Sequence, residues 1–287
     1  MMKKNVLLLL LSYFTASTTV QAQMVFFPYD LSYYQVLDTA RYELTYAMRF
    51  KYDAKAKETY EDIRKVQVGS RIVKDYSHLM FHYDSLRTAN EKKGLNSSIF
   101  QKPVFAYEIF NHYSDKTTLF VHRLFLASGC IGWQDAESTL DWKLEESDTV
   151  HILGYNCNKA SVDFKGRHYT AWYSTAIPIA VGPYRFGGLP GLIMKIEESN
   201  GVFAWELKGM ENVKKPICEY KYDKYTKCTA KDASKTIRRM FESPLSFLQS
   251  SGSNIQVKRP NGSFSTATTD DEKKMEYEEI ELQIEKN

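Results

Sequence analysis

The sequence has little cysteine, no excess of one charge and no long apolar run beyond its first residues. Only four of its 287 residues are cysteine and none form a CxxC pair, which argues against a zinc site of the usual thiolate spacing. A formal net charge of +3 gives no electrostatic case for nucleic acid or an anionic membrane surface. No later apolar run approaches the ~20 residues that a membrane-spanning helix needs.

The motifs of several enzyme classes are also absent. The chain has no GxSxG nucleophile elbow and no GxxxxGK phosphate loop. His78 and His82 have a metal-like spacing but lack the glutamate of an HExxH motif. No motif therefore combines a nucleophile, a base and an orienting group, and we expect no metal and no cofactor.

The first 22 residues have the composition of a signal peptide. Lys3 and Lys4 precede an apolar core at Leu7–Leu11, and small and polar residues end in Val20-Gln21-Ala22. This pattern predicts cleavage after Ala22, and the core is too short to anchor the chain in a bilayer. We expect a periplasmic or secreted protein with a net charge near +1 and no transmembrane segment.

An exported protein meets an oxidising compartment, so disulfides are possible. Four cysteines allow three pairings, among which the sequence does not choose. Cys218 and Cys228 flank a polar segment and are the candidate bridge. Cys157 lies in an apolar alternation and could equally be a small buried hydrophobic residue.

The dominant hydrophobic period is two. Between Tyr42 and Tyr52 every second side chain is apolar, which predicts a long half-buried strand. The same pattern predicts strands or hairpins near residues 63–68, 71–76, 104–110, 118–125, 140–144, 150–152, 157–164, 169–173, 192–197 and 203–207. Serial hairpins indicate a mainly β (α+β) fold, with one curved antiparallel sheet or an open barrel.

One or two short helices should accompany the sheet. Residues 78–92 lose the alternation, and residues 232–243 place apolar side chains on one face before Pro244. We expect residues 23–250 to form a single domain. Residues 251–287 are polar and should be a partly disordered tail, although Tyr277, Ile280, Leu282 and Ile284 could add a final edge strand.

Residues 182–197 read GPYRFGGLPGLIMKIE and combine glycine, proline and apolar side chains in one loop. Glycine permits positive φ, which we expect at Gly188 and Gly191, and proline fixes φ near −65°. The loop is predicted either to be a stiff structural corner, which we favour, or to form the rigid wall of an apolar ligand groove. The candidate binding residues are Trp172, Pro183, Phe186, Gly188, Leu189, Pro190, Gly191 and Leu192.

Three segments carry a resemblance to a known family. GYNCNKA, GRHYTAWYSTAIPI and GPYRFGGLPGLI, at residues 154–160, 166–179 and 182–193, together resemble the GLPGLI family of bacterial envelope proteins. Upstream, Val68-Gly69 with Ser77 and Asp84-Ser85 resemble its N-terminal pattern, whereas Ser174 stands where the family's threonine is expected. The resemblance implies an envelope protein but no activity, because the family is named for its motif.

Two classes of function remain open. We expect a non-enzymatic protein that holds an apolar ligand or an envelope protein partner on its sheet. The alternative is a hydrolase or maturation factor whose site is assembled from dispersed residues. Such a site would join His151 or His168 and an acid to Cys157 or Ser174.

Overall fold

Alternating side chains build one large sheet. The computed structural model describes residues 26–96, 102–126, 128–136, 139–222 and 224–281, so the predicted signal peptide lies outside the described residues. The strands of the sheet are β1 (Tyr34–Phe50), β2 (Tyr60–Val68), β3 (Ile72–Ser77), β4 (Tyr107–His112), β5 (Thr117–Arg123), β6 (Cys130–Ala136), β7 (Lys143–Ile152), β8 (Tyr155–Phe164), β9 (Arg167–Ser174), β10 (Leu192–Glu198), β11 (Phe203–Tyr220) and β12 (Tyr225–Lys227).

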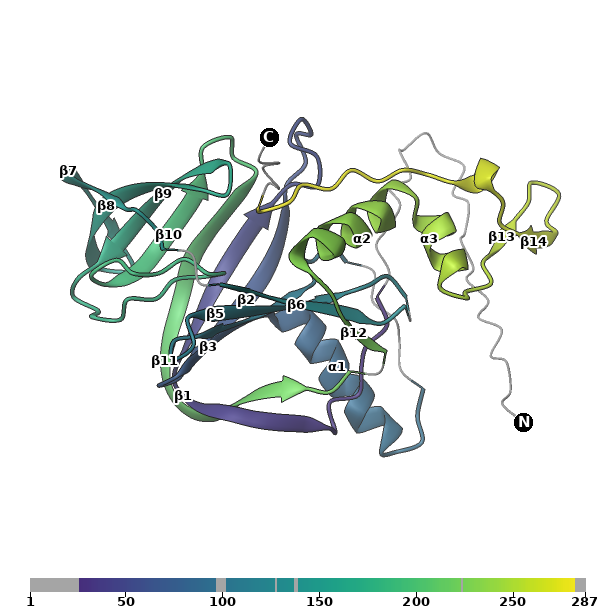
Figure 1. Cartoon of the computed structure of the whole chain (residues 1–287), viewed down its shortest axis with the longest axis horizontal. Coiled ribbons are helices and arrows are strands. Elements are labelled where there is room, and N and C mark those ends of the chain that lie inside the picture. Colours follow the sequence, from purple (N-terminus) through teal and green to yellow (C-terminus); the bar gives the residue numbers. More distant parts are fainter. Residues whose placement is uncertain (1–25, 97–101, 127, 137–138, 223, 282–287) are drawn as a thin grey trace.

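These strands follow the order β12-β6-β5-β4-β3-β2-β1-β11-β10-β9-β8-β7. All neighbours are antiparallel except β12 and β6, which run parallel. The sheet is strongly curved without closing on itself, and β7 and β12 are its two edges (Figure 1). The predicted fold class is therefore confirmed, in the form of an open curved sheet.

The described residues contain three α-helices instead of one or two. These are α1 (His78–Glu91), α2 (Ala230–Glu242) and α3 (Pro244–Ser250). The Ser77 hydroxyl accepts a hydrogen bond from the Met80 amide, 3.3 Å away, and Thr229 caps α2 in the same way at 3.1 Å. Pro244 ends α2 as predicted, but it also begins α3, because proline is well suited to the first turn of a helix.

Both faces of the sheet are covered near its middle. The largest hydrophobic cluster joins β1–β5 to β8–β11 and to the loop between β9 and β10. A second cluster lies under α2 and α3, and a third lies between β3–β5 and the outer half of the β1–β11 pair. All six residues of β3 are buried as a result, including the charged Lys74 and Asp75.

The C-terminal part crosses the molecule instead of extending the sheet. Two short strands, β13 (Gln256–Lys258) and β14 (Phe264–Thr266), form a hairpin followed by the 3₁₀ turn η1 (Thr269–Asp271). Residues 275–281 then run past α2 towards β1 and β2 (Figure 1). Tyr277 and Ile280 pack there without strand pairing, and the other two residues of the predicted edge strand, Leu282 and Ile284, lie outside the described residues.

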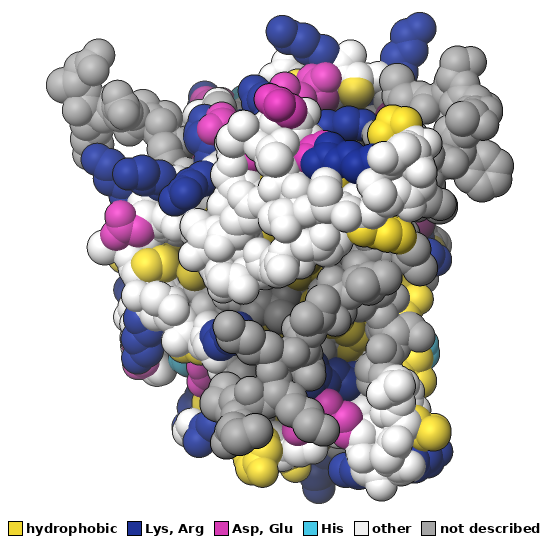
Figure 2. Space-filling model, turned by 90° about the vertical axis from the view of Figure 1, so that its right-hand side faces the viewer, with side chains coloured by type: hydrophobic (Ala, Val, Ile, Leu, Met, Phe, Trp, Pro, Cys, Tyr) yellow, Lys and Arg dark blue, Asp and Glu magenta, His cyan; other side chains and the backbone are white. Residues whose placement is uncertain are grey.

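No helix within the described ranges is long and apolar enough to cross a membrane. On the face that Figure 2 shows, hydrophobic side chains are scattered, and Lys and Arg side chains lie beside Asp and Glu. Among the side chains coloured on this face, neither one charge nor apolar groups form a broad patch.

Candidate functional site

The glycine-rich loop connects β9 to β10 and is mostly part of the core. Leu192 is fully buried, Leu189 is 1% exposed and Phe186 is 2% exposed. The Phe186 ring lies 4.8 Å from that of Tyr169 and 5.8 Å from that of Trp205, measured between centroids. These contacts attach the loop to the interior of the sheet.

The eight predicted binding residues do not share one surface. Pro183 is buried with the core residues above, whereas Gly188 and Pro190 are exposed. Trp172 lies on the opposite face of β9 from Ala171 and Tyr173, where the Lys195 ammonium is 4.6 Å from its ring centroid. Trp172 is therefore only half-buried, at the margin of the hydrophobic cluster that contains Phe186, Leu189 and Leu192.

Positive φ occurs at one of the two glycines of the corner where it was predicted. Gly188 has φ +83°, but Gly191 is not in the left-handed region. A Cβ at Gly191 would lie 2.1 Å from the carbonyl oxygen of Ser174, so glycine is required there by close backbone approach. The second left-handed residue of the loop is Tyr184, with φ +60°.

Tyr184 ties the corner to the other half of the sheet. Its amide donates to the buried Asp75 carboxylate of β3 at 2.6 Å, and its carbonyl accepts from the Asn111 side chain of β4 at 3.1 Å. A left-handed tyrosine is unusual, and such a residue persists only where its surroundings hold it in place. The hydrogen bond to a buried carboxylate provides that restraint.

Asp75 belongs to a buried ion cluster. The Arg64 guanidinium donates to Asp75 at 2.8 Å and to Asp62 at 3.2 Å, and its remaining donors reach the carbonyls of Phe105 and Tyr107. Burial raises the pKa of Asp62 to about 6, against the opposing effect of Arg64. Every partner is internal, so we assign this cluster to holding β2, β3 and the corner together.

A surface hollow of about 580 Å³ lies beside the outer part of the corner. Its size is within the range of ligand sites, roughly 300–1,000 Å³. One wall is formed by the loop at residues 178–181 and Gly188, and the other comes from β1, the β2–β3 turn and the β4–β5 turn. The lining residues on that second wall are Arg41, Tyr42, Val68, Gly69, Ser70 and Tyr113.

Arg41 is the distinctive group of this hollow. It is exposed, and among the described residues its guanidinium makes no ion pair or hydrogen bond. Pro178, Ile179 and Val181 give the opposite wall apolar character. The hollow therefore offers an unneutralised cation and an apolar surface side by side, and of the eight predicted binding residues only Gly188 lines it.

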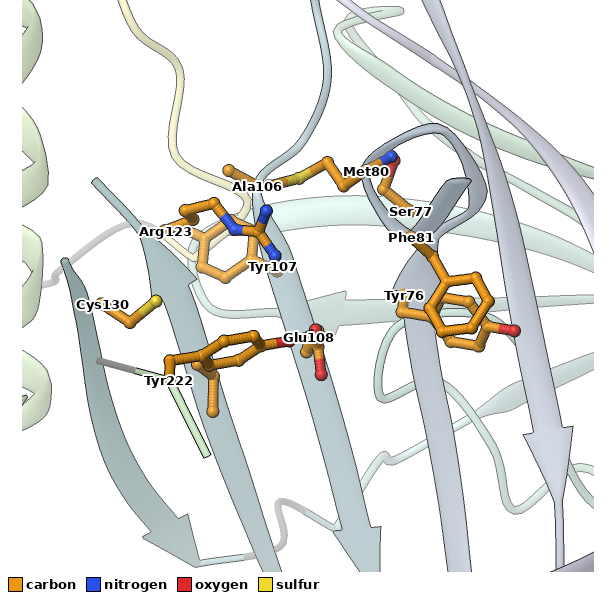
Figure 3. A pocket seen from close by; sticks show the side chains of 11 residues that line it. Tyr76, Ser77, Met80, Phe81, Ala106, Tyr107, Glu108, Arg123, Cys130 and Tyr222 are labelled. Atoms are coloured by element: carbon orange, nitrogen blue, oxygen red, sulfur yellow. Dashed lines mark hydrogen bonds between the residues drawn. The ribbon is translucent and has the colours of Figure 1, made fainter. Parts of the chain in front are cut away.

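A second cluster of reactive side chains is enclosed under α1. Figure 3 shows the Tyr222 hydroxyl directed at Glu108, with Cys130 and Arg123 on neighbouring strands; the cavity between them is about 10 Å³. Burial opposes ionisation of Glu108, but Lys74 and Tyr222 lower its pKa below the ordinary value. Burial raises the pKa of the Cys130 thiol to about 12. This cavity is large enough for about one water and contains no reactive thiolate.

Arg123 completes that enclosed cluster as a structural ion pair. Its two terminal nitrogens donate to Asp84 of α1 at 2.7 and 2.8 Å, and its guanidinium carbon lies 4.6 Å from the Tyr29 ring centroid. Asp84 also accepts from the Tyr29 amide at 2.7 Å. These contacts fix α1 and the N-terminal segment on the sheet.

The residues proposed for a dispersed hydrolase site are not brought together. His168 pairs with Asp163 at 2.7 Å in an exposed position, and Ser174 lies six residues along the same strand, roughly 20 Å away. His151 is opposite Asn156 and therefore on the other face of the hairpin from the buried Cys157. Ser174 donates its hydroxyl to the Asn156 carbonyl at 2.8 Å instead of to a base.

All four cysteines lie in the described part of the chain, and all are free thiols. Cys218 is buried on β11, opposite Val36 of β1, and Cys228 packs against the cluster under α2. The structure thus does not form the predicted Cys218–Cys228 bridge. Within the described ranges, no group of three or more His, Cys, Asp or Glu side chains is placed to hold a metal ion.

A family model described as a protein of unknown function (Porph_ging) matches residues 161–195, which include β9 and most of the corner. No curated protein matches the chain. Two solved structures, titled "Structure of PNGF-II in P21 space group" and "Structure of PNGF-II in C2 space group", are similar at 18% and 17% identity over 69% of this chain.

The two PNGF-II structures are much longer than the matched region. The match covers 33% and 32% of those chains, so this chain spans about a third of their length. The TM-scores are 0.44 and 0.46. A likeness at this level assigns neither a shared activity nor a shared substrate.

Proposed function

We propose that this chain is an exported envelope protein of the GLPGLI type that binds an amphipathic anion in the hollow beside its corner. Support for the family comes from the ordered motifs at residues 154–193, and the short match to a family of unknown function falls in the same region. Support for the compartment comes from the signal-peptide pattern of residues 1–22.

The observation that carries the proposal is the unpaired Arg41 at a hollow with an apolar wall. A guanidinium binds carboxylate or phosphate through parallel hydrogen bonds, which fixes the orientation of the anion. Ile179, Val181 and Pro178 would then cover the apolar part of the same molecule. A ligand that joins an anionic head to an apolar body satisfies both walls at once.

The rigid corner gives such a site a fixed shape. The loop is held by buried Leu189 and Leu192 on one side and by the Tyr184 hydrogen bonds on the other. A wall that is already ordered loses little conformational entropy when a ligand binds. The structural role and the binding role of the corner are thus compatible.

The binding proposal predicts a specific loss on removal of the Arg41 charge. A fluorescent fatty acid, 11-(dansylamino)undecanoic acid, should bind the wild-type protein and should bind Arg41→Gln at least ~10-fold more weakly. Such a loss corresponds to about 1.4 kcal/mol. Arg49→Gln is the matched control, because Arg49 is exposed on the same strand and also unpaired. Equal affinity of both variants for the probe would contradict the proposed site.

The proposed compartment has its own test. Protein purified from its native envelope should begin at Gln23 when its N-terminus is sequenced, because the leader is removed after Ala22. Mass spectrometry of the same preparation should also identify any amphipathic anion that copurifies. An intact Met1 on the envelope-associated protein would contradict signal-peptide cleavage.

A further inference from the structure

Residues 275–281 (MEYEEIE) fill a trough on the concave side of the molecule. The Tyr277 ring stacks on that of Phe241 with centroids 4.2 Å apart, and its hydroxyl lies 2.9 Å from that of Tyr107. Ile280 is only 3% exposed and joins the main hydrophobic cluster. Two apolar anchors three residues apart therefore hold this segment in place.

The glutamates of the segment meet a set of cations from several elements. Arg167 donates to the Glu278 carboxylate at 3.0 Å and to the Glu279 carbonyl at 2.8 Å. Arg185 lies 3.1 Å from Glu281. Two further pairs, Arg238 with Glu279 at 2.7 Å and Lys165 with Glu281 at 3.7 Å, complete the set. The trough is thus a basic, aromatic surface that an acidic segment covers.

The fit of the segment to the trough is incomplete. A cavity of about 120 Å³ remains beneath it, with aromatic walls from Tyr107, Phe120, Trp133 and Tyr184. The charged side chains of Asp135, Lys165, Glu279 and Glu281 also line this space. The segment forms no strand pairing, and exposed Lys273 and Lys274 precede it. These features are those of a bound peptide more than of a permanent part of the sheet.

We propose that this trough is a recognition site for an extended acidic peptide of a partner protein, and that residues 275–281 occupy it as an internal ligand. The partner segment should place an aromatic residue and an aliphatic residue three positions apart, with carboxylates beside them. Basic and aromatic side chains bind such sequences through charge-assisted hydrogen bonds and ring contacts. A partner would bind by displacing the chain's own segment, which lowers its apparent affinity.

The test uses the full chain with a weakened internal segment. A fluorescein-labelled peptide of residues 274–281, KMEYEEIE, is titrated by fluorescence anisotropy with the wild type and with Tyr277→Ser/Ile280→Ser. The double variant should bind the peptide at least ~10-fold more tightly, because its own segment no longer competes. A second variant, Glu278→Gln/Glu281→Gln, retains both apolar anchors and replaces the first variant if that one fails to fold. It should bind the peptide more tightly than the wild type does, by a smaller factor than expected for the first variant.

Two controls make the expected binding specific. The peptide KMQYQQIQ, which lacks the carboxylates, should bind the double variant at least ~10-fold more weakly, and salt should weaken KMEYEEIE binding. Adding Arg167→Gln should reduce binding, whereas adding Arg49→Gln should not. Equal binding of both peptides, or none to either folded variant, would overturn the proposal. Concentration-dependent dimerisation of the double variant would instead indicate exchange of the segment between two copies and would also overturn it.

Discussion

At the scale of single residues, the corner depends on two kinds of backbone restraint. Tyr184 adopts positive φ because the Asp75 carboxylate and the Asn111 side chain hold its peptide groups. Gly191 is restrained by space, because the Ser174 backbone lies where a Cβ would be. The sequence predicted that glycines would be needed here, but it could not predict which of them would meet another strand.

Gly191→Ala should destabilise the protein more than Gly188→Ala. The added Cβ at position 191 would clash with the backbone of β9, which is fixed by pairing with β10. Overpacking typically costs ~1–3 kcal/mol of stability, and we expect a loss at or above the upper end of this range. At position 188 the Cβ would meet open space, and only the left-handed φ should cost about 1–2 kcal/mol. Equilibrium denaturation in guanidinium chloride measures both values. A larger loss for Gly188→Ala would contradict the close-approach explanation.

His122 should make the protein sensitive to acid. The side chain is 1% exposed, its Nδ1 has no hydrogen-bond partner in the described structure, and burial lowers its pKa to about 3. Between pH 6.5 and about 3 the unfolded chain binds a proton that the folded chain does not, so stability falls as the pH falls. The loss approaches ~1.4 kcal/mol for each pH unit crossed. Asp62 changes stability in the opposite direction as the pH falls. Burial raises its pKa to about 6, so the folded chain binds this proton at a higher pH than the unfolded chain does.

The variant His122→Leu isolates this effect. Its free energy of unfolding should fall less steeply than that of the wild type between pH 6.5 and pH 4, while Asp62 contributes equally to both proteins. Denaturant titrations at half-unit pH intervals give the two profiles. If the difference between them stays constant over this range, His122 is not the acid-sensitive group.

At the scale of elements, alternation predicted strands well wherever one face is buried and the other is not. The observed β8 and β9 cover the predicted segments, whereas β1 begins earlier than predicted, at Tyr34, and ends at Phe50 instead of Tyr52. β6 was not predicted, because Cys130, Ile131 and Gly132 are buried consecutively and give no period of two. β11 extends well past Leu207, because its largely exposed second half continues to pair with β1.

The residues of the hollow could not have been grouped from the sequence. The motif at residues 182–193 identified the corner, and Val68-Gly69 was singled out upstream, but nothing linked either to Arg41 or Tyr113. They belong to separate elements that come together only in the folded sheet, and Arg41 itself lies at the β1 irregularity between Ala40 and Tyr42. A local pattern contains no information on which exposed arginine lacks a partner.

Leu192→Ala should weaken the attachment of the corner to the sheet. Leu192 is fully buried at the start of β10, so its truncation should cost about 2–5 kcal/mol through lost burial and an internal cavity. Leu144→Ala is the control, because Leu144 is 56% exposed on β7 and should change stability by less than ~0.5 kcal/mol. Thermal unfolding of both variants measures the contrast. Similar losses in both would show that the corner is not a core element.

At the scale of the whole molecule, two cross-connections join the halves of the curved sheet. The halves meet directly where β1 pairs with β11, and the corner adds contacts from the β9–β10 loop to β3 and β4. Arg185 extends this connection to β6, since it lies 3.2 Å from Asp135 and donates to the Ala136 carbonyl at 2.8 Å. The curved sheet should therefore unfold as one cooperative unit.

Arg185→Met tests this cooperativity. The Arg185 side chain is 3% exposed, and its loss leaves Asp135 and Glu281 without that partner, at a cost of about 1–3 kcal/mol. Three of the four tryptophans lie on the β7–β11 side, so their fluorescence reports mainly on that half, whereas far-UV circular dichroism reports on all strands. Both signals should shift to lower denaturant by the same amount, because a weakened connection destabilises a single cooperative unit as a whole.

Arg49→Met, at an exposed and unpaired arginine, should shift neither signal. If the fluorescence transition of Arg185→Met moved away from the circular dichroism transition, the two halves would be separate folding units, and the corner would connect them without making them cooperative.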